Sequence, residues 1–462
     1  MKLTTIKSEG LAHNSYYLSD EAEAVVIDPR RDCKVYARLA GKECASIKYI
    51  LETHRNEDYV VGSLELQNMT EAEIGHSKAL PFKYGEHRFD DEDAIAVGSL
   101  TIKVVRTPGH TDDSLCYVVY RSESPKEAVN VFTGDTLFVG SVGRTDLYGK
   151  KVQSQQSRKL YRSLTEKVLP LGDHVVIYPA HGAGSVCGGD IGFMETSTIG
   201  YEKKTNPYLQ LEEAGFVKRA GSEMLIVPRY FKEMEKYNMN GPPPLSELSF
   251  PRPISIADFE DHMKEPNMIV VDTRNPYSFA GSHIPRSLSI WLAGTSVYPG
   301  WLLPIDQYIV FVLERPEDIK KVASRFRRLG FDNMCGYLCP GISEWQEAGK
   351  PIASLGTLSV QQLKSKLQKK KVTLLDVREL SEWMQGHIES AKQIFFADLD
   401  DKAISMEKDK PIAVACSVGN RSSIGASILK RQGFKEVYNV LGGVTAWQAN
   451  GYPLKKGSSI KT

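Results

Sequence analysis

Short apolar segments separated by turn residues dominate the first third of the chain. Segments such as Ala24–Ile27 and Leu100–Arg106 are rich in Val, Ile and Leu and predict β-strands. Between such strands, stretches 33–43, 60–69 and 154–168 space their apolar residues as amphipathic helices do. The pattern therefore predicts a mixed α and β domain and excludes a pure β-sandwich.

The pattern is interrupted at 237–253, where the composition changes abruptly. Three consecutive prolines end at Pro244, and proline disfavours both helix interiors and central strands. Proline-rich segments of this kind act as semi-rigid spacers between domains. We predict a linker over 237–253 that ends a first domain spanning residues 1–236.

Beyond the linker the chain repeats itself at an offset of 102–105 residues. Met268–Arg274 corresponds to Val372–Arg378, and an Asp-x-Arg, a Gly-His-Ile-like and a Gly-x-x-x-Trp element recur in both copies. Each copy alternates apolar strands with helical stretches, which predicts a parallel sheet covered by helices. The two domains are expected at 254–353 and 357–456.

Composition limits the functions that these domains can have. The 462 residues carry a charged fraction of 25% and a formal net charge of +1, without the basic excess typical of nucleic-acid or membrane-surface binding. No apolar run resembles a signal core or a membrane span, and seven scattered cysteines fit reduced thiols. We expect a soluble, cytoplasmic protein that forms a homo-oligomer.

Four groups that can bind a metal each follow an apolar strand and a turn containing Gly or Pro in the first domain. They are His54, His110, Asp135 and His181. This placement predicts side chains on loops at one edge of a sheet, where binding residues usually lie. A lone histidine is more often structural, but four such positions in succession indicate a metal site.

The first of these loops, His54-Arg-Asn56-Glu-Asp58-Tyr59, resembles the His-x-His-x-Asp-His pattern of the metallo-β-lactamase superfamily. Within that superfamily, Thr-Pro-Gly-His-Thr, Phe-Thr-Gly-Asp and Val-Gly-Arg-Thr-Asp are most similar to persulfide dioxygenases. The resemblance implies an αββα sandwich and a single Fe(II) per chain, held by His54, His110 and Asp135. No nucleotide-binding pattern is present, so we expect no nucleotide cofactor.

The donor types point to the same chemistry. Two imidazoles and a carboxylate form the facial triad of non-haem Fe(II) oxygenases. A hydrolytic two-metal site needs a second ligand set, for which Asn56 and Tyr59 are poor substitutes for histidine. We expect Asp58, Asn56, Tyr59 and His181 to surround the metal or line the substrate pocket.

Two further residues of the first domain are candidates. The resemblance implies that Arg144 contacts the anionic part of a thiol substrate. Cys187 lies six residues after His181 in a glycine-rich loop, a stretch that resembles bacterial dioxygenase–rhodanese fusions. A reactive thiol there is able to accept or relay sulfane sulfur, whereas the alternative is a cysteine packed under a loop.

The last repeat contains a strand, Cys416, a short loop and a helix-like run. This arrangement directs backbone N–H groups and a helix N-terminus at the sulfur, which stabilises an anion there. It resembles the active loop of a rhodanese, in which the cysteine carries a persulfide. The loop residues expected to hold that persulfide are Ser417, Val418, Gly419, Asn420, Arg421 and Ser422. Leu313 stands opposite Cys416 in the first repeat, so 254–353 is expected to be a degenerate copy.

The expected function is oxidation of a low-molecular-weight thiol persulfide by O₂ to sulfite and thiol. Cys416 would then transfer sulfane sulfur to sulfite, giving thiosulfate, with Arg421 and Cys187 as further catalytic candidates. Two alternatives remain open: a glyoxalase II-like thioesterase, and a sulfur carrier or sensor in which only Cys416 reacts. Neither nucleic acid nor membrane is an expected partner.

Overall fold

The computed structural model describes residues 1–223, 226–403 and 406–457. Contacts divide the chain into two compact units. One unit comprises Met1–Leu248 with Arg327–Gly330, and the other comprises Ser249–Phe326 with Phe331–Thr462.

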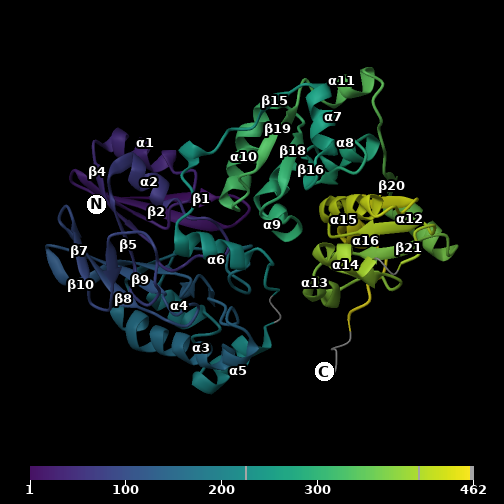
Figure 1. Cartoon of the computed structure of the whole chain (residues 1–462). Helices are drawn as coiled ribbons and strands as arrows, with labels where there is room; N and C mark the ends of the chain where they lie inside the picture. Colours follow the sequence, from purple (N-terminus) through teal and green to yellow (C-terminus); the bar gives the residue numbers. More distant parts are fainter. Residues whose placement is uncertain (224–225, 404–405, 458–462) are drawn as a thin grey trace. The chain divides into compact units, whose positions relative to one another are not determined.

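Two six-stranded sheets form the centre of the first unit (Figure 1). The first sheet has the order β1 (Lys2–Ser8), β2 (His13–Asp20), β3 (Glu23–Ile27), β4 (Ser46–Leu51), β5 (Glu73–Ser77), β6 (His87–Phe89). The second has the order β14 (Ser197–Thr198), β13 (Val176–Pro179), β10 (Ser124–Gly134), β9 (Leu115–Arg121), β8 (Leu100–Arg106), β7 (Ala94–Val97). A short hairpin joins β11 (Leu137–Phe138) to β12 (Ser141–Val142).

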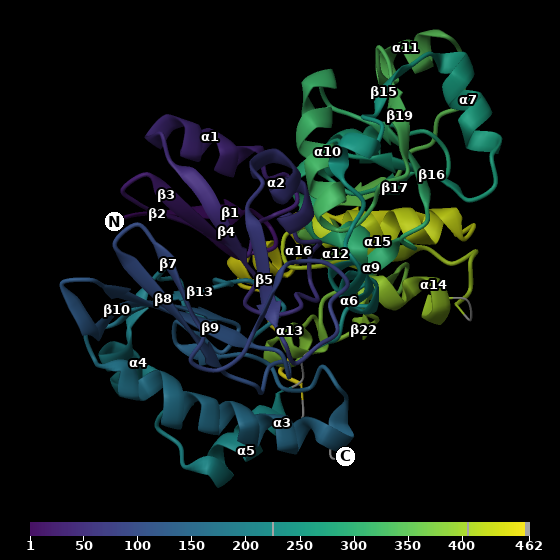
Figure 2. The same cartoon turned by 60° about the vertical axis from the view of Figure 1, so that its left-hand side comes forward.

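The sheets pack face to face, and helices cover their outer faces. Leu18, Val25 and Leu51 of the first sheet share one core with Val104 and Phe132 of the second. The helices are α1 (Lys34–Glu43), α2 (Ser63–Thr70), α3 (Lys150–Arg162) with a π-turn (Ser163–Val168), α4 (Ile199–Thr205), α5 (Glu213–Ser222) and α6 (Phe231–Asn240). Figure 2 shows α3 beside α5 below the second sheet, where both contribute to a second core. The predicted αββα sandwich is confirmed.

Two details differ from the sequence-based expectation. Helix α3 begins at Lys150, four residues before the predicted stretch, and its last predicted turn is the π-turn. Helix α6 continues through Asn240, so regular structure extends into the stretch predicted as a linker. Because the three prolines lie after Asn240, they are compatible with a helix that ends just before them.

The second unit contains two five-stranded parallel sheets with the same strand order. The first sheet is β15 (Arg252–Ile254), β19 (Met334–Leu338), β18 (Tyr308–Val312), β16 (Met268–Asp272), β17 (Leu288–Ser289). The second is β20 (Gly356–Leu358), β24 (Val437–Val440), β23 (Ile412–Ala415), β21 (Thr373–Asp376), β22 (Lys392–Gln393). The predicted parallel sheets and the predicted repeat are both confirmed.

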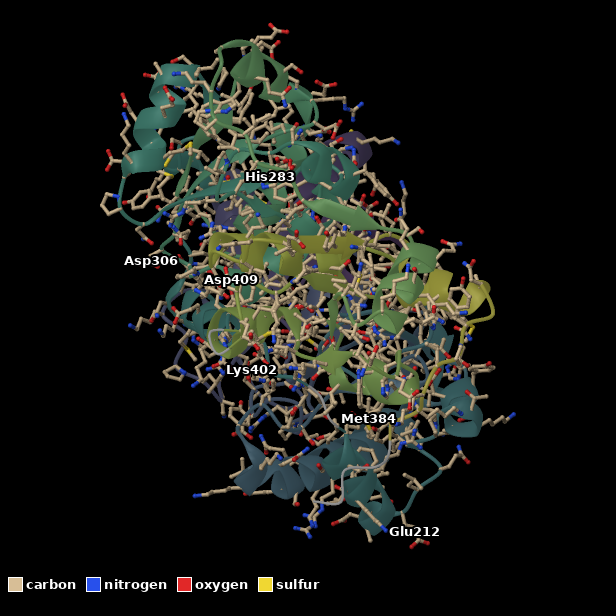
Figure 3. All side chains as sticks on the ribbon, turned by 90° about the vertical axis from the view of Figure 1, so that its right-hand side faces the viewer. Glu212, His283, Asp306, Met384, Lys402 and Asp409 are labelled. Carbon is tan, nitrogen blue, oxygen red and sulfur yellow. The ribbon has the colours of Figure 1, made fainter. Side chains whose placement is uncertain are left out.

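Helices cover each of these sheets, as buried apolar strands require. The first copy has α7 (Ile256–Lys264), α8 (Pro276–Gly281), α9 (Tyr298–Leu302), α10 (Ile319–Arg328) and α11 (Ile342–Glu347). The second has α12 (Val360–Gln368), α13 (Leu380–Gln385), α14 (Leu399–Lys402), α15 (Asn420–Arg431) and α16 (Gly443–Ala449). Figure 3 labels Met384 on α13 and Lys402 at the end of α14. Among the residues described, no helix is long and apolar enough to cross a membrane.

Candidate functional site

The ends of strands from both sheets of the first unit bring the predicted metal ligands together. His54 lies just after β4 of the first sheet, whereas His110 and Asp135 follow β8 and β10 of the second. The expectation of a single sheet edge is therefore wrong, because the site lies where the two sheets meet. Gly143 approaches so closely that a Cβ there would lie 1.9 Å from the Asp135 carbonyl oxygen, so only glycine fits.

Hydrogen bonds fix which nitrogen of each imidazole faces the centre. His110 Nδ1 lies 2.8 Å from the carbonyl oxygen of Arg144, which can only accept, so Nδ1 carries the proton. Thr53 donates its hydroxyl to Asp28 and accepts from His54 Nδ1 at 3.0 Å. Each neutral imidazole consequently presents the lone pair of Nε2 to the centre, as a metal ligand does.

A fourth group, Glu57, joins these ligands. Its carboxylate lies 3.1 Å from His110 Nε2 and 3.6 Å from His54 Nε2, and Asp135 Oδ2 lies 3.5 Å and 3.9 Å from the same nitrogens. The ligand atoms of all four residues lie within 4.8 Å of one another. His54 Nε2, His110 Nε2, Asp135 Oδ2 and Glu57 Oε2 are buried and have no hydrogen-bond partner among the residues described. Four such atoms around one point fit a bound cation.

The pKa values also show that this centre favours positive charge. Burial alone would lower the pKa of His54, but Glu57 and Asp135 beside it raise that pKa to about 9. Burial would raise the pKa of Glu57, yet His110 and His54 hold it well below its ordinary value. In the absence of metal, protons on the imidazoles supply the charge that a cation supplies when bound.

His181 binds two carboxylates instead of facing the centre. Its Nδ1 lies 2.7 Å from Asp135 Oδ1 and its Nε2 lies 2.9 Å from Asp58 Oδ2. Burial opposes protonation, but the two carboxylates raise the pKa of His181 well above its ordinary value. Ligand atoms of Asp58, His181 and Cys187 also lie within 4.8 Å of one another, so His181 belongs to a second group of possible metal donors. It also occupies one oxygen of Asp135 and leaves the other, Oδ2, directed at His54 and His110.

The substituted positions of the first loop are buried beside the centre. The Asn56 side-chain amide donates to the His54 carbonyl at 3.3 Å, and the Asn56 carbonyl accepts from Asn238. The Tyr59 ring packs against the His13 ring in a tilted arrangement, with ring centroids 4.0 Å apart. Asn56 Oδ1 and the Tyr59 hydroxyl have no hydrogen-bond partner among the described residues. Polar atoms of this kind are suited to meet water or substrate.

Arg144 and Cys187 are also buried at this site. The Arg144 guanidinium forms a bidentate ion pair with Asp146 at 2.7 and 2.8 Å, and its carbonyl orients His110. Cys187 donates its thiol to Glu57 Oε1 at 3.5 Å. Burial, then Asp58 and Glu57, raise the pKa of the Cys187 thiol well above its ordinary value, so the sulfur retains its proton in the absence of metal.

Three residues near the centre were missed in the sequence. Glu57 occupies a position that the ligand pattern leaves variable, and His13 lies on β2, far from any recognisable pattern. The buried Tyr230 precedes α6, and its hydroxyl has no partner among the residues described. Of the three, only Glu57 could have been recognised from the sequence, because it is an acidic residue between two positions already assigned to the site.

The second predicted site lies on the loop between β23 and α15. Cys416 is buried, and the Gly419 N–H donates to its sulfur at 3.1 Å. Ser422 Oγ lies 3.4 Å from the same sulfur and is itself bonded to Asn439. Gly419 has φ +108°, a conformation that glycine adopts without strain and that turns this N–H inward. Asn420 begins α15, and Val418 is exposed at the rim.

Arg421 lies beside the loop, and its guanidinium forms an ion pair with Glu382. Its guanidinium donates to both oxygens of Glu382 at 2.6 and 2.7 Å, and to Ser417 at 2.9 Å. Glu382 lies on α13 and was not singled out from the sequence. Since Arg421 is held in this way, it closes the side of the loop as a fixed cation.

Comparisons with known proteins agree with the predicted domain composition. A model of the metallo-β-lactamase superfamily matches residues 9–181, and a model of the rhodanese-like domain matches residues 255–348 and again 359–450. The chain is a fusion of a metallo-β-lactamase domain and two rhodanese-like domains. This fusion was the architecture expected from the sequence, and it is confirmed.

Relatives of the metallo-β-lactamase domain include proteins with two different named activities. Human persulfide dioxygenase ETHE1, mitochondrial, is 29% identical over 222 residues, covering 46% of this chain and 78% of that protein. Hydroxyacylglutathione hydrolase from Francisella tularensis subsp. novicida is 29% identical over 181 residues, covering 38% of this chain and 64% of that protein. A solved metallo-β-lactamase from Staphylococcus aureus subsp. aureus COL covers 73% of this chain and 98% of its own, with 28% identity and a TM-score of 0.65. Together with the rhodanese-like domains, the similarity to ETHE1 supports an enzyme that acts on sulfur compounds.

Proposed function

We propose that the fusion is an iron(II)-dependent persulfide dioxygenase coupled to a rhodanese sulfurtransferase that disposes of thiol persulfides. The observation that carries the proposal is that buried ligand atoms of His54, His110 and Asp135 converge without hydrogen-bond partners among the described residues. Two loop positions at which the two-metal pattern has histidine hold Asn56 and Tyr59 instead. A single metal with histidine and carboxylate ligands suits oxygenase chemistry, whereas hydrolysis in this superfamily relies on a pair of metals.

The residues of the first unit have distinct roles in this proposal. Iron(II) held by His54, His110 and Asp135 would supply redox chemistry with O₂ and a binding position for sulfur. Thr53 and the Arg144 carbonyl keep both Nε2 lone pairs directed inward. In the net reaction a persulfide, O₂ and water give a thiol, sulfite and protons, so the terminal sulfur is oxidised and O₂ is reduced.

The rhodanese loop would use the product. Cys416 thiolate takes the terminal sulfur from a second persulfide, forming a new S–S bond and releasing the thiol. Sulfite then attacks that outer sulfur, giving thiosulfate and restoring the Cys416 thiolate. The Gly419 N–H, which donates to the Cys416 sulfur at 3.1 Å, would hold negative charge on that sulfur during both steps. Arg421, whose charge is balanced by Glu382, would border the rim of the loop where the anionic acceptor enters.

Oxygen uptake by the iron-loaded full-length protein tests this function. The protein would be purified anaerobically, loaded with Fe(II), analysed for metal, and assayed in an O₂ electrode with glutathione, cysteine and coenzyme A persulfides. We expect a single iron per chain, persulfide-dependent O₂ uptake, loss of uptake in His110→Ala, and full uptake in Cys416→Ser. Loss of uptake in Cys416→Ser would instead favour a sulfur carrier in which only that cysteine reacts.

The similarity to hydroxyacylglutathione hydrolase supports a second candidate, a metal-dependent thioesterase. It predicts two zinc ions per chain and cleavage of S-lactoylglutathione. Asn56 and Tyr59 weigh against it because neither supplies an imidazole for the second metal. Thioester cleavage by the zinc-loaded protein, without O₂ uptake by the iron-loaded protein, would decide for the thioesterase.

A further inference from the structure

Glu57 lies within the metal centre although the ligand pattern of the superfamily has no donor at its position. The side chain is only 1% exposed, and it lies one residue beyond Asn56, which replaces a ligating histidine. Its Oε1 is 3.1 Å from His110 Nε2 and its Oε2 is 3.6 Å from His54 Nε2. The loop has thus lost an imidazole at one position and placed a carboxylate at the next.

The donors around the Glu57 carboxylate favour a role as a metal ligand. Both Nε2 atoms present lone pairs when the imidazoles are neutral, and Asp135 Oδ2 is anionic. A second carboxylate beside them would be repelled in a buried space, where unpaired charge is costly. A cation bound among the four groups removes that cost, since carboxylate oxygen and imidazole nitrogen are common metal donors.

We propose that Glu57 is a fourth ligand of the metal, and that it yields its position when a thiolate or persulfide sulfur binds. The inference rests on the metal centre of the proposed function and adds a step of substrate entry. A divalent cation with Asp135, Glu57 and two neutral imidazoles carries no net charge, so an anionic sulfur gains little attraction until Glu57 leaves. Replacement of the Glu57 carboxylate by an anionic sulfur keeps the number of ligands unchanged. It also keeps unchanged the summed charge of the metal and the ligands bound to it.

Glu57 also has a hydrogen-bond donor that is not one of the imidazoles. The Cys187 thiol donates to Glu57 Oε1 at 3.5 Å, and both side chains are buried. A carboxylate that leaves the metal therefore keeps a partner and is not left unpaired in the interior. The contact supplies a partner that lowers the cost of displacing this carboxylate from the metal.

Cobalt(II) titration of the full-length metal-free protein tests this inference, because its visible absorption reports both affinity and coordination. Glu57→Gln keeps the shape but loses the anionic donor, and Glu57→Asp keeps the charge but shortens the reach. Loss of an outer partner of a metal costs 10–100-fold in affinity, so we expect each variant to lose about 10-fold or more. Glu235→Gln is the matched control, since it removes a half-buried carboxylate that pairs with Arg55. Its affinity should stay within about 2-fold.

Glutathione added to the cobalt protein provides the second measurement. We expect its thiolate-to-cobalt absorption to saturate at a lower glutathione concentration in Glu57→Gln than in the wild type, because no carboxylate competes. Unchanged cobalt affinity in a Glu57→Gln protein with wild-type circular dichroism would overturn the inference, as would weaker thiolate binding. Neither measurement involves O₂, so failure of the dioxygenase assay with an intact Glu57 effect would overturn only the proposed function.

Discussion

The two rhodanese-like copies hold the same ion pair in the same place but differ in the loop beside it. Arg274 donates to Asp272 at 2.6 Å, and Arg378 donates to Asp376 at 2.7 Å. In both copies the arginine also binds a backbone carbonyl eight residues further along the chain. The Asp-x-Arg element, which identifies the family in sequence, is therefore part of the scaffold and not of the chemistry.

The other repeated elements are scaffold as well. His283 Nδ1 bonds the Phe279 carbonyl at 2.8 Å, and His387 Nδ1 bonds the Trp383 carbonyl at 3.0 Å. The indole N–H of Trp345 donates to the Pro351 carbonyl at 2.9 Å, and that of Trp447 donates to the Pro453 carbonyl at 3.0 Å. Equivalent contacts in the copy that contains Cys416 and the copy that contains Leu313 show that these residues support the fold whether or not a thiol is present.

The loops after β18 and β23 differ at each position that touches the sulfur. Counting from the ends of these strands, Leu313 occupies the place of Cys416 and Pro316 the place of Gly419. Proline has no N–H, so the donor that bonds Cys416 is absent from the first copy. Asp318 stands where Arg421 stands, with opposite charge. The two copies thus share their scaffold and differ in the loop residues that surround the sulfur.

Among the substitutions that test the difference between the two copies, Cys416→Ser is expected to have the largest effect on sulfur transfer. A hydroxyl cannot hold sulfane sulfur, so transfer from glutathione persulfide to sulfite should fall to background, as in the first copy. Thiosulfate formation and intact-mass measurement of added sulfur would check this. O₂ uptake is the internal control and should persist. Residual thiosulfate at the wild-type rate would show that another cysteine, such as Cys187, carries the sulfur.

Removal of the scaffold carboxylate should affect both copies equally. Asp272→Ala and Asp376→Ala each leave a buried arginine without its partner, which costs about 3–5 kcal/mol. Differential scanning calorimetry of the full-length protein should show a lowered transition in either variant. If Asp376→Ala removed sulfur transfer without lowering a transition, the carboxylate would have a role in chemistry and the scaffold interpretation would fail.

Much of this arrangement could be predicted from sequence, for physical reasons. Repeats and strand-end ligands leave short, regular patterns, so the fusion, His54, His110, Asp135 and Cys416 were recognisable. The two hydrogen-bond contacts of His181 could not be predicted, because its partners Asp135 and Asp58 lie 46 and 123 residues away in the sequence. Glu57 was missed because an irregular loop has no fixed period, so spacing does not tell which side chains turn inward.

Gly341 and Gly443 occupy corresponding positions near the end of the two copies, and their substitution is expected to have an effect of intermediate size. Gly443 has φ +53°, and a Cβ there would lie 2.1 Å from the Cys416 carbonyl oxygen. At Gly341, its counterpart, the nearest atom to an added Cβ is a Glu344 side-chain oxygen at 3.7 Å. A non-glycine residue in the left-handed region costs about 1–3 kcal/mol, so Gly443→Ala should lower the thermal transition and slow sulfur transfer, while Gly341→Ala should do neither. Equal effects on both variants would contradict this assignment.

The smallest expected effect is that of restoring a thiol to the first copy. Leu313→Cys in a Cys416→Ser background places a cysteine at the end of β18, but the following residues remain Glu314, Arg315 and Pro316. No N–H is available at the position of Gly419, and the neighbouring acids disfavour a thiolate. Leu313 is buried, so its loss should cost about 1–3 kcal/mol of stability, with no gain of sulfur transfer. Recovery of thiosulfate formation would show that the thiol alone suffices, and that the loop donors of the second copy contribute little.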